Sequence, residues 1–200
     1  MAGPVSILVV EDDPDLRSLF RVWLADDDVK TVESGELAVQ SADETVDVVL
    51  LDRDLPGIDG KVVARRLQAE GFQGTVAMVT GRDPEPAVAT FPIDEYVTKP
   101  IERAELRAVV DRLSARREVP ESVRTLFGLL TRRARLESTL DTRRLADSDE
   151  FEALTGRIDD QWATVRKETT VSAVSTMAEA CLSPVVDCGR TLETPARVQQ

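Results

Sequence analysis

Short apolar runs alternate with amphipathic stretches through the first 117 residues, and this alternation limits the fold more than any other feature. Five runs have the length and β-branched character of buried strands. They cover residues 5–10, 29–32, 46–51, 75–79 and 95–97. Helical patterns follow most of them, and a stretch with three prolines follows the fourth. This order predicts a flavodoxin-like, doubly wound α/β domain with a five-stranded parallel sheet covered on both faces.

The second half of the chain has no strand pattern. Residues 121–140 place apolar side chains at helical spacing, and a second helical pattern runs from Asp147, with Glu150 as its capping-box partner, to about Leu182. We therefore expect a first domain over 1–117, a helical hairpin or coiled-coil module over 118–184, and a flexible tail over 185–200.

Two helices with narrow apolar stripes bury too little surface to be stable alone. The stripe of the second helix consists of Phe151, Leu154, Ile158 and Trp162. We expect this stripe either to form a homodimer or to dock on the first domain.

Composition excludes several classes of function. The chain has no histidine, so histidine ligands, nucleophiles and bases are excluded. Its net charge is −12, and residues 1–114 carry 12 basic and 23 acidic side chains, which disfavours nucleic-acid binding by the first domain. No apolar run reaches the roughly 20 residues of a membrane span, and the N-terminus lacks the basic region of a secretory signal. Two cysteines and no disulfide framework favour a cytoplasmic location.

Chemically active residue types follow the predicted strands. Glu11 and Asp12 follow the first strand, Asp52 the third, Thr80 the fourth and Lys99 the fifth. The carboxyl ends of parallel strands meet at one edge of a sheet, so we expect these side chains to converge. An oxygen-only ligand set favours Mg²⁺. Asp52 could then attack phosphorus, while Lys99 and Thr80 stabilise the phosphoryl oxygens.

Four motifs, ILVVEDDP, VVLLDRDLPGIDG, VAMVTG and DEYVTKP, give residues 1–117 a specific likeness. This region resembles a response-regulator receiver domain of two-component signalling. The resemblance implies that Asp52 is the phosphoacceptor, that Glu11 and Asp12 bind the metal, that Thr80 is the switch hydroxyl, and that Lys99 is the family's conserved lysine.

The same resemblance implies that Tyr96 reorients on phosphorylation, that the backbone carbonyl of Asp54 contributes to the metal site, and that the Lys99–Pro100 bond is cis. Two features depart from the family pattern. The side chain of Asp54 is acidic, and Lys99 lies only 19 positions after Thr80, with three prolines between them. The second departure shortens the fourth helix, which is part of the family's usual output face.

Residues 120–185 weakly resemble HalX, a helical module of halophilic archaea, through VRTLFGLLTRRARLESTL and SDEFEALTGRIDD. An acidic chain with 21 arginines and 4 lysines is consistent with a high-salt proteome, although a GC-rich genome would also favour arginine.

We therefore predict a phosphorylation-dependent switch that is not a turnover enzyme. A sensor histidine kinase would supply the phosphoryl group, and an unknown output protein would respond, with control of transcription as one outcome. One alternative is a DNA-binding transcription factor that uses the helices of residues 120–185. The other is a phosphohydrolase of the haloacid-dehalogenase type, for which Asp52-Arg53-Asp54 fits the signature but stands after the wrong strand.

Overall fold

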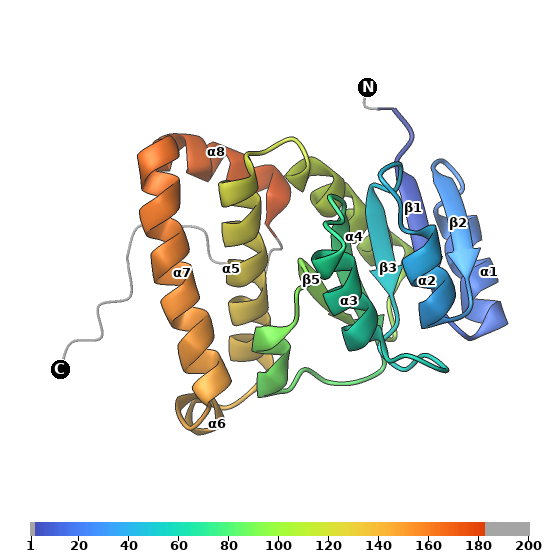
Figure 1. Cartoon of the computed structure of the whole chain (residues 1–200), viewed down its shortest axis with the longest axis horizontal. Coiled ribbons are helices and arrows are strands. Elements are labelled where there is room, and N and C mark those ends of the chain that lie inside the picture. Colours follow the sequence, from blue (N-terminus) through green and yellow to red (C-terminus); the bar gives the residue numbers. More distant parts are fainter. Residues whose placement is uncertain (1–2, 183–200) are drawn as a thin grey trace. The chain divides into compact units, whose positions relative to one another are not determined.

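The computed structural model of the chain describes residues 3–182. Five parallel strands form one sheet in the order β2-β1-β3-β4-β5 (Figure 1). The strands are β1 (Ser6–Val10), β2 (Asp28–Val32), β3 (Val48–Leu51), β4 (Thr75–Thr80) and β5 (Glu95–Thr98). The predicted five-stranded, doubly wound parallel sheet is confirmed.

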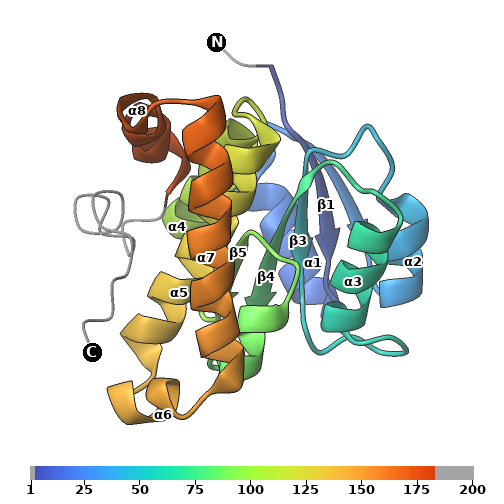
Figure 2. The same cartoon turned by 60° about the vertical axis from the view of Figure 1, so that its left-hand side comes forward.

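Helices cover both faces of this sheet (Figure 2). Ile7 and Val9 of β1 lie in one core cluster with Phe20 of α1 (Pro14–Trp23) and Leu106 of α4 (Arg103–Arg116). Helices α2 (Gly35–Ser41) and α3 (Gly60–Ala69) lie on the other face. Side chains alternate between faces along a strand, so strands buried on both sides need continuous apolar runs, as this sequence has.

The helix starts follow from capping residues. The Asp13 carboxylate accepts hydrogen bonds from the first-turn N–H groups of α1, and Pro14 occupies a position where its missing N–H has no consequence. Ser34 caps α2 through the Leu37 N–H. The Lys99–Pro100 peptide bond is cis, which confirms that prediction.

The chain divides into two compact units, and the second unit also includes one segment from within residues 1–117. The first, here the α/β unit, contains the chain up to Asp83 and Phe91–Arg117. The second, here the helical unit, contains Pro84–Thr90 together with the chain from Glu118 onward. The connection between β4 and β5 therefore belongs to the helical unit, although the sequence pattern assigns it to the first domain.

As far as Leu182, where the described part of the chain ends, the helical unit contains one short 3-10 helix and four α-helices. They are η1 (Pro86–Thr90), α5 (Glu121–Thr139), α6 (Thr142–Ala146), α7 (Asp149–Glu168) and α8 (Val171–Cys181). Helices α5 and α7 pack against each other as the predicted hairpin. η1 is the helix between β4 and β5, and it is short, as the sequence predicts, because prolines interrupt this stretch.

Three details of this unit correct the sequence-based interpretation. The stretch between the two expected helical patterns contains α6, which Asp141 caps through the Arg144 N–H. The cap of α7 is Ser148, whose hydroxyl accepts from the Phe151 N–H, and not Asp147. The single helix expected up to Leu182 breaks at residues 169–170, where Thr170 caps α8. Local side-chain caps decide all three boundaries.

The apolar stripe of α7 is covered within the chain. Leu154, Ile158 and Trp162 are buried, and Phe151 is half-buried. Helix α7 packs on α5 and on η1, so the third surface that the stripe needs comes from the segment between β4 and β5. The expected homodimer through these helices is therefore not required to cover the stripe.

Two further predictions concern the ends of the chain and membranes. The flexible tail over 185–200 and Cys188 lie outside the described residues, whereas Cys181 is buried in the last turn of α8, the final described helix of the helical unit. Within residues 3–182, no helix combines the length and apolar character that crossing a bilayer demands.

Candidate functional site

Hydrogen bonds of the sheet continue one residue past the strand ends and fix the backbone of the site. The Asp52 N–H donates to the carbonyl of Val10 at 2.8 Å, and the Lys99 N–H donates to the carbonyl of Thr80 at 2.7 Å. The Glu11 N–H donates likewise to β2. The predicted residues are thus held at the carboxyl edge of the sheet by the same ladder that forms it.

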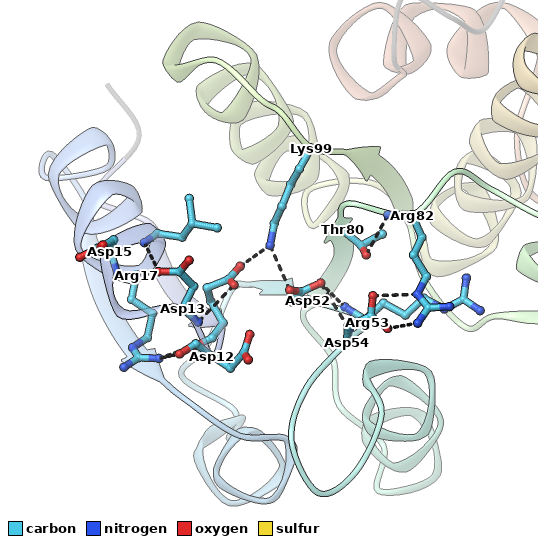
Figure 3. A network of polar contacts seen from close by, with 12 residues as sticks. Asp12, Asp13, Asp15, Arg17, Asp52, Arg53, Asp54, Thr80, Arg82 and Lys99 are labelled. Carbon is cyan, nitrogen blue, oxygen red and sulfur yellow. Dashed lines mark hydrogen bonds and ion pairs between the residues drawn. The ribbon is translucent and has the colours of Figure 1, made fainter.

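Lys99 joins two of the carboxylates. Its Nζ lies 2.5 Å from Oε2 of Glu11. The same Nζ lies 3.0 Å from Oδ2 of Asp52 (Figure 3). Only 2% of Glu11 and 7% of Asp52 is exposed. A cation between two largely buried carboxylates offsets their repulsion, so this contact explains how two acids share one buried site.

Burial shifts the ionisation of this group. Desolvation raises the pKa of Glu11 above its ordinary value, against the lowering effect of Lys99. Burial by itself would lower the pKa of Lys99, but hydrogen bonds to Glu11 and Asp52 raise it. Lys99 is therefore charged at neutral pH and is available to interact with an anionic group at Asp52.

Three carboxylates can bind one cation. Ligand oxygens of Glu11, Asp12 and Asp52 all lie within 4.8 Å of one another, and Asp12 is exposed to solvent. This all-oxygen donor set, open on one side, suits Mg²⁺, which keeps several waters and takes few protein ligands. The residues present therefore fit the predicted metal.

The side chain of Asp54 does not join this group. Its carboxylate accepts two hydrogen bonds from Arg82, at 2.7 Å from Nε and 2.7 Å from the terminal nitrogen. The bonds from Arg82 hold the pKa of Asp54 below its ordinary value. A metal contact from the Asp54 backbone carbonyl stays a prediction.

Thr80 and Tyr96 lie beyond Asp52, on the side of β4 and β5. The Thr80 hydroxyl is buried and accepts from the Arg82 N–H at 3.4 Å. The Tyr96 ring is buried, and its hydroxyl donates to the Arg82 carbonyl at 2.9 Å. Arg82 thus contacts both predicted switch residues.

The loop after Asp52 depends on a close backbone approach. The Arg53 N–H donates to Oδ1 of Asp52 at 2.6 Å, and the Gly60 N–H donates to the Arg53 carbonyl at 2.8 Å. A Cβ at Gly60 would lie 2.1 Å from the Asp52 carbonyl oxygen, so only glycine fits there. Gly57 adopts a φ of 77°, which also favours glycine.

Sequence reasoning missed two arginines at this site. Arg17 donates to the backbone carbonyls of Glu11 and Asp12, at 2.7 Å each, and fixes the acidic loop. Arg82 pairs with Asp54, as described above. Neither residue lies at a position to which the motifs assign a role. For Arg17, the sequence signal is its position one turn into the helix that follows the acidic run. For Arg82, the only sequence signal is its position two residues after Thr80.

Comparisons with known proteins agree with this geometry. The response regulator receiver domain family matches residues 7–111, and the HalX domain family matches residues 115–172. A Haloferax volcanii protein named "Putative transcriptional regulator" is 37% identical over 150 residues, covering 74% of this chain and 25% of that protein. Transcriptional regulatory protein TcrA of Mycobacterium tuberculosis is 38% identical over 122 residues, covering 58% of this chain and 48% of that protein. The chain therefore spans between a quarter and about half of these relatives.

Solved structures give the same result for the α/β unit. The receiver domain of a Pseudomonas aeruginosa sensor histidine kinase, with a magnesium ion coordinated in its active site cleft, superimposes with a TM-score of 0.52. It is 28% identical and covers 56% of this chain and 98% of its own. Receiver domains bind Mg²⁺ at such an acidic site, and their relatives include many transcriptional regulators. With more than half of its residues matched, the chain belongs to the response regulator receiver family and carries a HalX domain after its receiver domain.

Proposed function

We propose that Asp52 accepts a phosphoryl group and that the receiver domain thereby changes the state of an output module. The observation that carries this proposal is the cluster at the carboxyl edge of the sheet. There Asp52 is nearly buried, lies 3.0 Å from the Lys99 ammonium, and shares a cation-binding geometry with Glu11 and Asp12. A carboxylate in that position is held ready to attack phosphorus.

The proposed transfer starts from phosphohistidine on a sensor kinase, since this chain has no histidine. A carboxylate oxygen of Asp52 forms a bond to phosphorus while the bond between phosphorus and the imidazole nitrogen breaks. The nitrogen keeps the electron pair and takes up a proton. Lys99 stabilises negative charge on the phosphoryl oxygens, and the Thr80 hydroxyl donates to one of them after the side chain turns.

Magnesium fits the same proposal. Glu11, Asp12, Asp52 and the backbone carbonyl of Asp54 would hold it, and the ion would supply charge neutralisation for the phosphoryl oxygens. When Thr80 turns, the Tyr96 ring would move further into the domain or out towards solvent, because both side chains hydrogen-bond to the backbone of Arg82. We place this switch in the cytoplasm, where ATP-dependent kinases act and where its thiols stay reduced.

The test is phosphorylation of the full chain by a small acyl-phosphate donor with Mg²⁺, followed by intact-mass measurement. Wild type should gain one phosphoryl group, and Asp52→Asn should gain none, because an amide is a very poor nucleophile. Asp159→Asn, an equivalent change at an exposed site of α7, should behave as wild type. An equal mass gain in Asp52→Asn would place the acceptor elsewhere.

A second assay, the release of phosphate from a phosphate ester over time, separates a switch from a phosphohydrolase. A switch releases phosphate only as fast as its own acyl phosphate hydrolyses, whereas an enzyme turns over a phosphate ester continuously. The haloacid-dehalogenase signature should end the first strand, but Asp52 follows β3. We therefore propose that the chain is not a turnover enzyme.

For the output we propose a protein partner of the helical unit. Two arginines that could contact nucleic acid are otherwise engaged, because Arg132 is buried and Arg133 pairs with Glu137 at 2.8 Å. Transcriptional control, in which the named relatives act, would then pass through that partner. Electrophoretic shifts across a salt series would overturn this choice if the chain bound DNA directly with a steep salt dependence.

A further inference from the structure

The segment between β4 and β5 is part of the core of the helical unit. Val88 and Ala89 of η1 are 0% and 1% exposed, and η1 packs on α5 and α7. A segment from between two strands of the α/β unit therefore completes the helical unit. The chain leaves the α/β unit after Asp83 and returns to it after Thr90.

Arg82 stands directly before this segment and contacts three groups of the site. Its N–H donates to the Thr80 hydroxyl at 3.4 Å, and its carbonyl accepts from the Tyr96 hydroxyl at 2.9 Å. Its guanidinium forms a two-point ion pair with Asp54, with both contacts at 2.7 Å (Figure 3). The backbone of Arg82 is thus tied to the two predicted switch residues, and its side chain to Asp54, whose own N–H donates to Asp52 at 3.4 Å.

The connection from Arg82 to the helical unit is short and stiff. One residue, Asp83, separates it from Pro84, and each residue spans at most about 3.6 Å. Pro84 and Pro86 have a fixed φ, so this stretch has few ways to absorb a displacement. A shift of the Arg82 backbone is therefore passed on to η1.

We propose that Arg82 is a positioning residue through which the phosphorylation state of Asp52 acts on the helical unit by way of segment 84–90. This inference rests on the proposed function. A phosphoryl group adds about 1.5 to 2 negative charges and three strong acceptors beside Asp54. The new charge repels the Asp54 carboxylate and attracts the Arg82 guanidinium, and Thr80 leaves the Arg82 N–H when it turns to the phosphoryl group. Arg82 then changes its contacts, and segment 84–90 moves with it.

Hydrogen exchange of the full chain, read by mass spectrometry, tests this coupling. Exchange is compared before and after phosphorylation, at equal phosphorylated fractions, in peptides that cover 84–90 and α7. Wild type should show a change in both peptides, and Arg82→Ala should lose at least half of it. Arg65→Ala, which removes an exposed arginine of α3, should keep the full change. Arg82→Lys keeps the charge and should restore part of the change, which a merely structural role would not predict.

A second variant approaches the same ion pair from its other side. Asp54→Asn keeps the shape of the side chain but removes its charge, and it should reduce the exchange response as Arg82→Ala does. A full response in Arg82→Ala or in Asp54→Asn overturns the role of the pair. A phosphoryl mass gain without any change at 84–90 and α7 in wild type overturns the coupling and leaves the proposed function intact. Absence of the mass gain overturns the proposed function and the coupling together.

Discussion

The two units of this chain differ in how their important contacts are encoded. In the α/β unit, the candidate site residues Glu11, Asp52 and Lys99 directly follow strands, and ladder hydrogen bonds such as that from Asp52 to Val10 hold them at one edge. In the helical unit, the stripe of α7 is completed by Val88 and Ala89, which lie some 60 residues earlier in the sequence. The position of a residue at the sheet edge is thus encoded by the strand that it follows. The core of the small helical unit instead depends on a distant segment of the chain, which no local sequence pattern identifies.

The largest expected effect is unfolding of the helical unit while the α/β unit stays folded. Replacing both Leu154 and Ile158 with Asp removes roughly 1.5–3 kcal/mol of burial per side chain and adds two unpaired buried carboxylates, each at a cost of several kcal/mol. Circular dichroism should show loss of helix. Intact-mass measurement should still show phosphorylation, because Asp52 and Lys99 belong to the other unit.

A matched control carries the same charges on the exposed face of α7. Ala153→Asp with Ala163→Asp should leave the helical signal close to that of wild type, since both positions are exposed. If the buried pair of substitutions also abolished phosphorylation while the control did not, the two units would not be independent in folding.

The second prediction tests the segment that the helical unit takes from the receiver chain. Val88→Ala removes both γ methyl groups of a fully buried side chain and should lower the free energy of unfolding by roughly 2 kcal/mol. Hydrogen exchange should rise in α5 and α7 and remain unchanged in β1 and β3. Val22→Ala, at a position of α1 that is 65% exposed, should have almost no effect. Faster exchange confined to the sheet would contradict the assignment of η1 to the helical unit.

The third prediction concerns the proposed metal site of the α/β unit. At a free Mg²⁺ concentration ten times its dissociation constant, binding should stabilise wild type by about 1.4 kcal/mol. Asp12→Ala should lose most of this gain, and its metal-free form should melt at or slightly above wild type, because carboxylate repulsion falls. Asp26→Ala, an exposed change after α1, should retain the shift. An undiminished Mg²⁺ shift in Asp12→Ala would remove that residue from the site.

The same difference explains what the sequence could predict. The apolar runs of the sequence predicted all five strands. The residue types at the strand ends predicted that Glu11, Asp52 and Lys99 lie together, because a parallel sheet brings those ends to one edge. The break between α7 and α8 was missed because it depends on one cap, Thr170. The pairing of Arg82 with Asp54 was missed because it joins loops 28 residues apart that share no periodic pattern.

The smallest expected effect is a response to acid that both units should share. Hydrogen bonds from the Thr45 hydroxyl at 2.6 Å and the Thr45 N–H at 2.9 Å hold the pKa of Asp43 below its ordinary value of 3.8. In the helical unit, the backbone N–H of Glu150 and the Ser148 hydroxyl lower the pKa of Glu150 below 4.5.

A lowered pKa means that the charged carboxylate stabilises the folded state above the unfolded value, and that this contribution is lost as the pH falls through the folded value. Asp43→Asn and Glu150→Gln keep an acceptor oxygen but carry no charge. Each should therefore melt slightly below wild type at pH 7, and the difference should close below about pH 4. Thermal melts from pH 7 to pH 3 provide the measurement. A difference that persists unchanged at pH 3 would assign the effect to packing or hydrogen-bond geometry and not to the charge of the carboxylate.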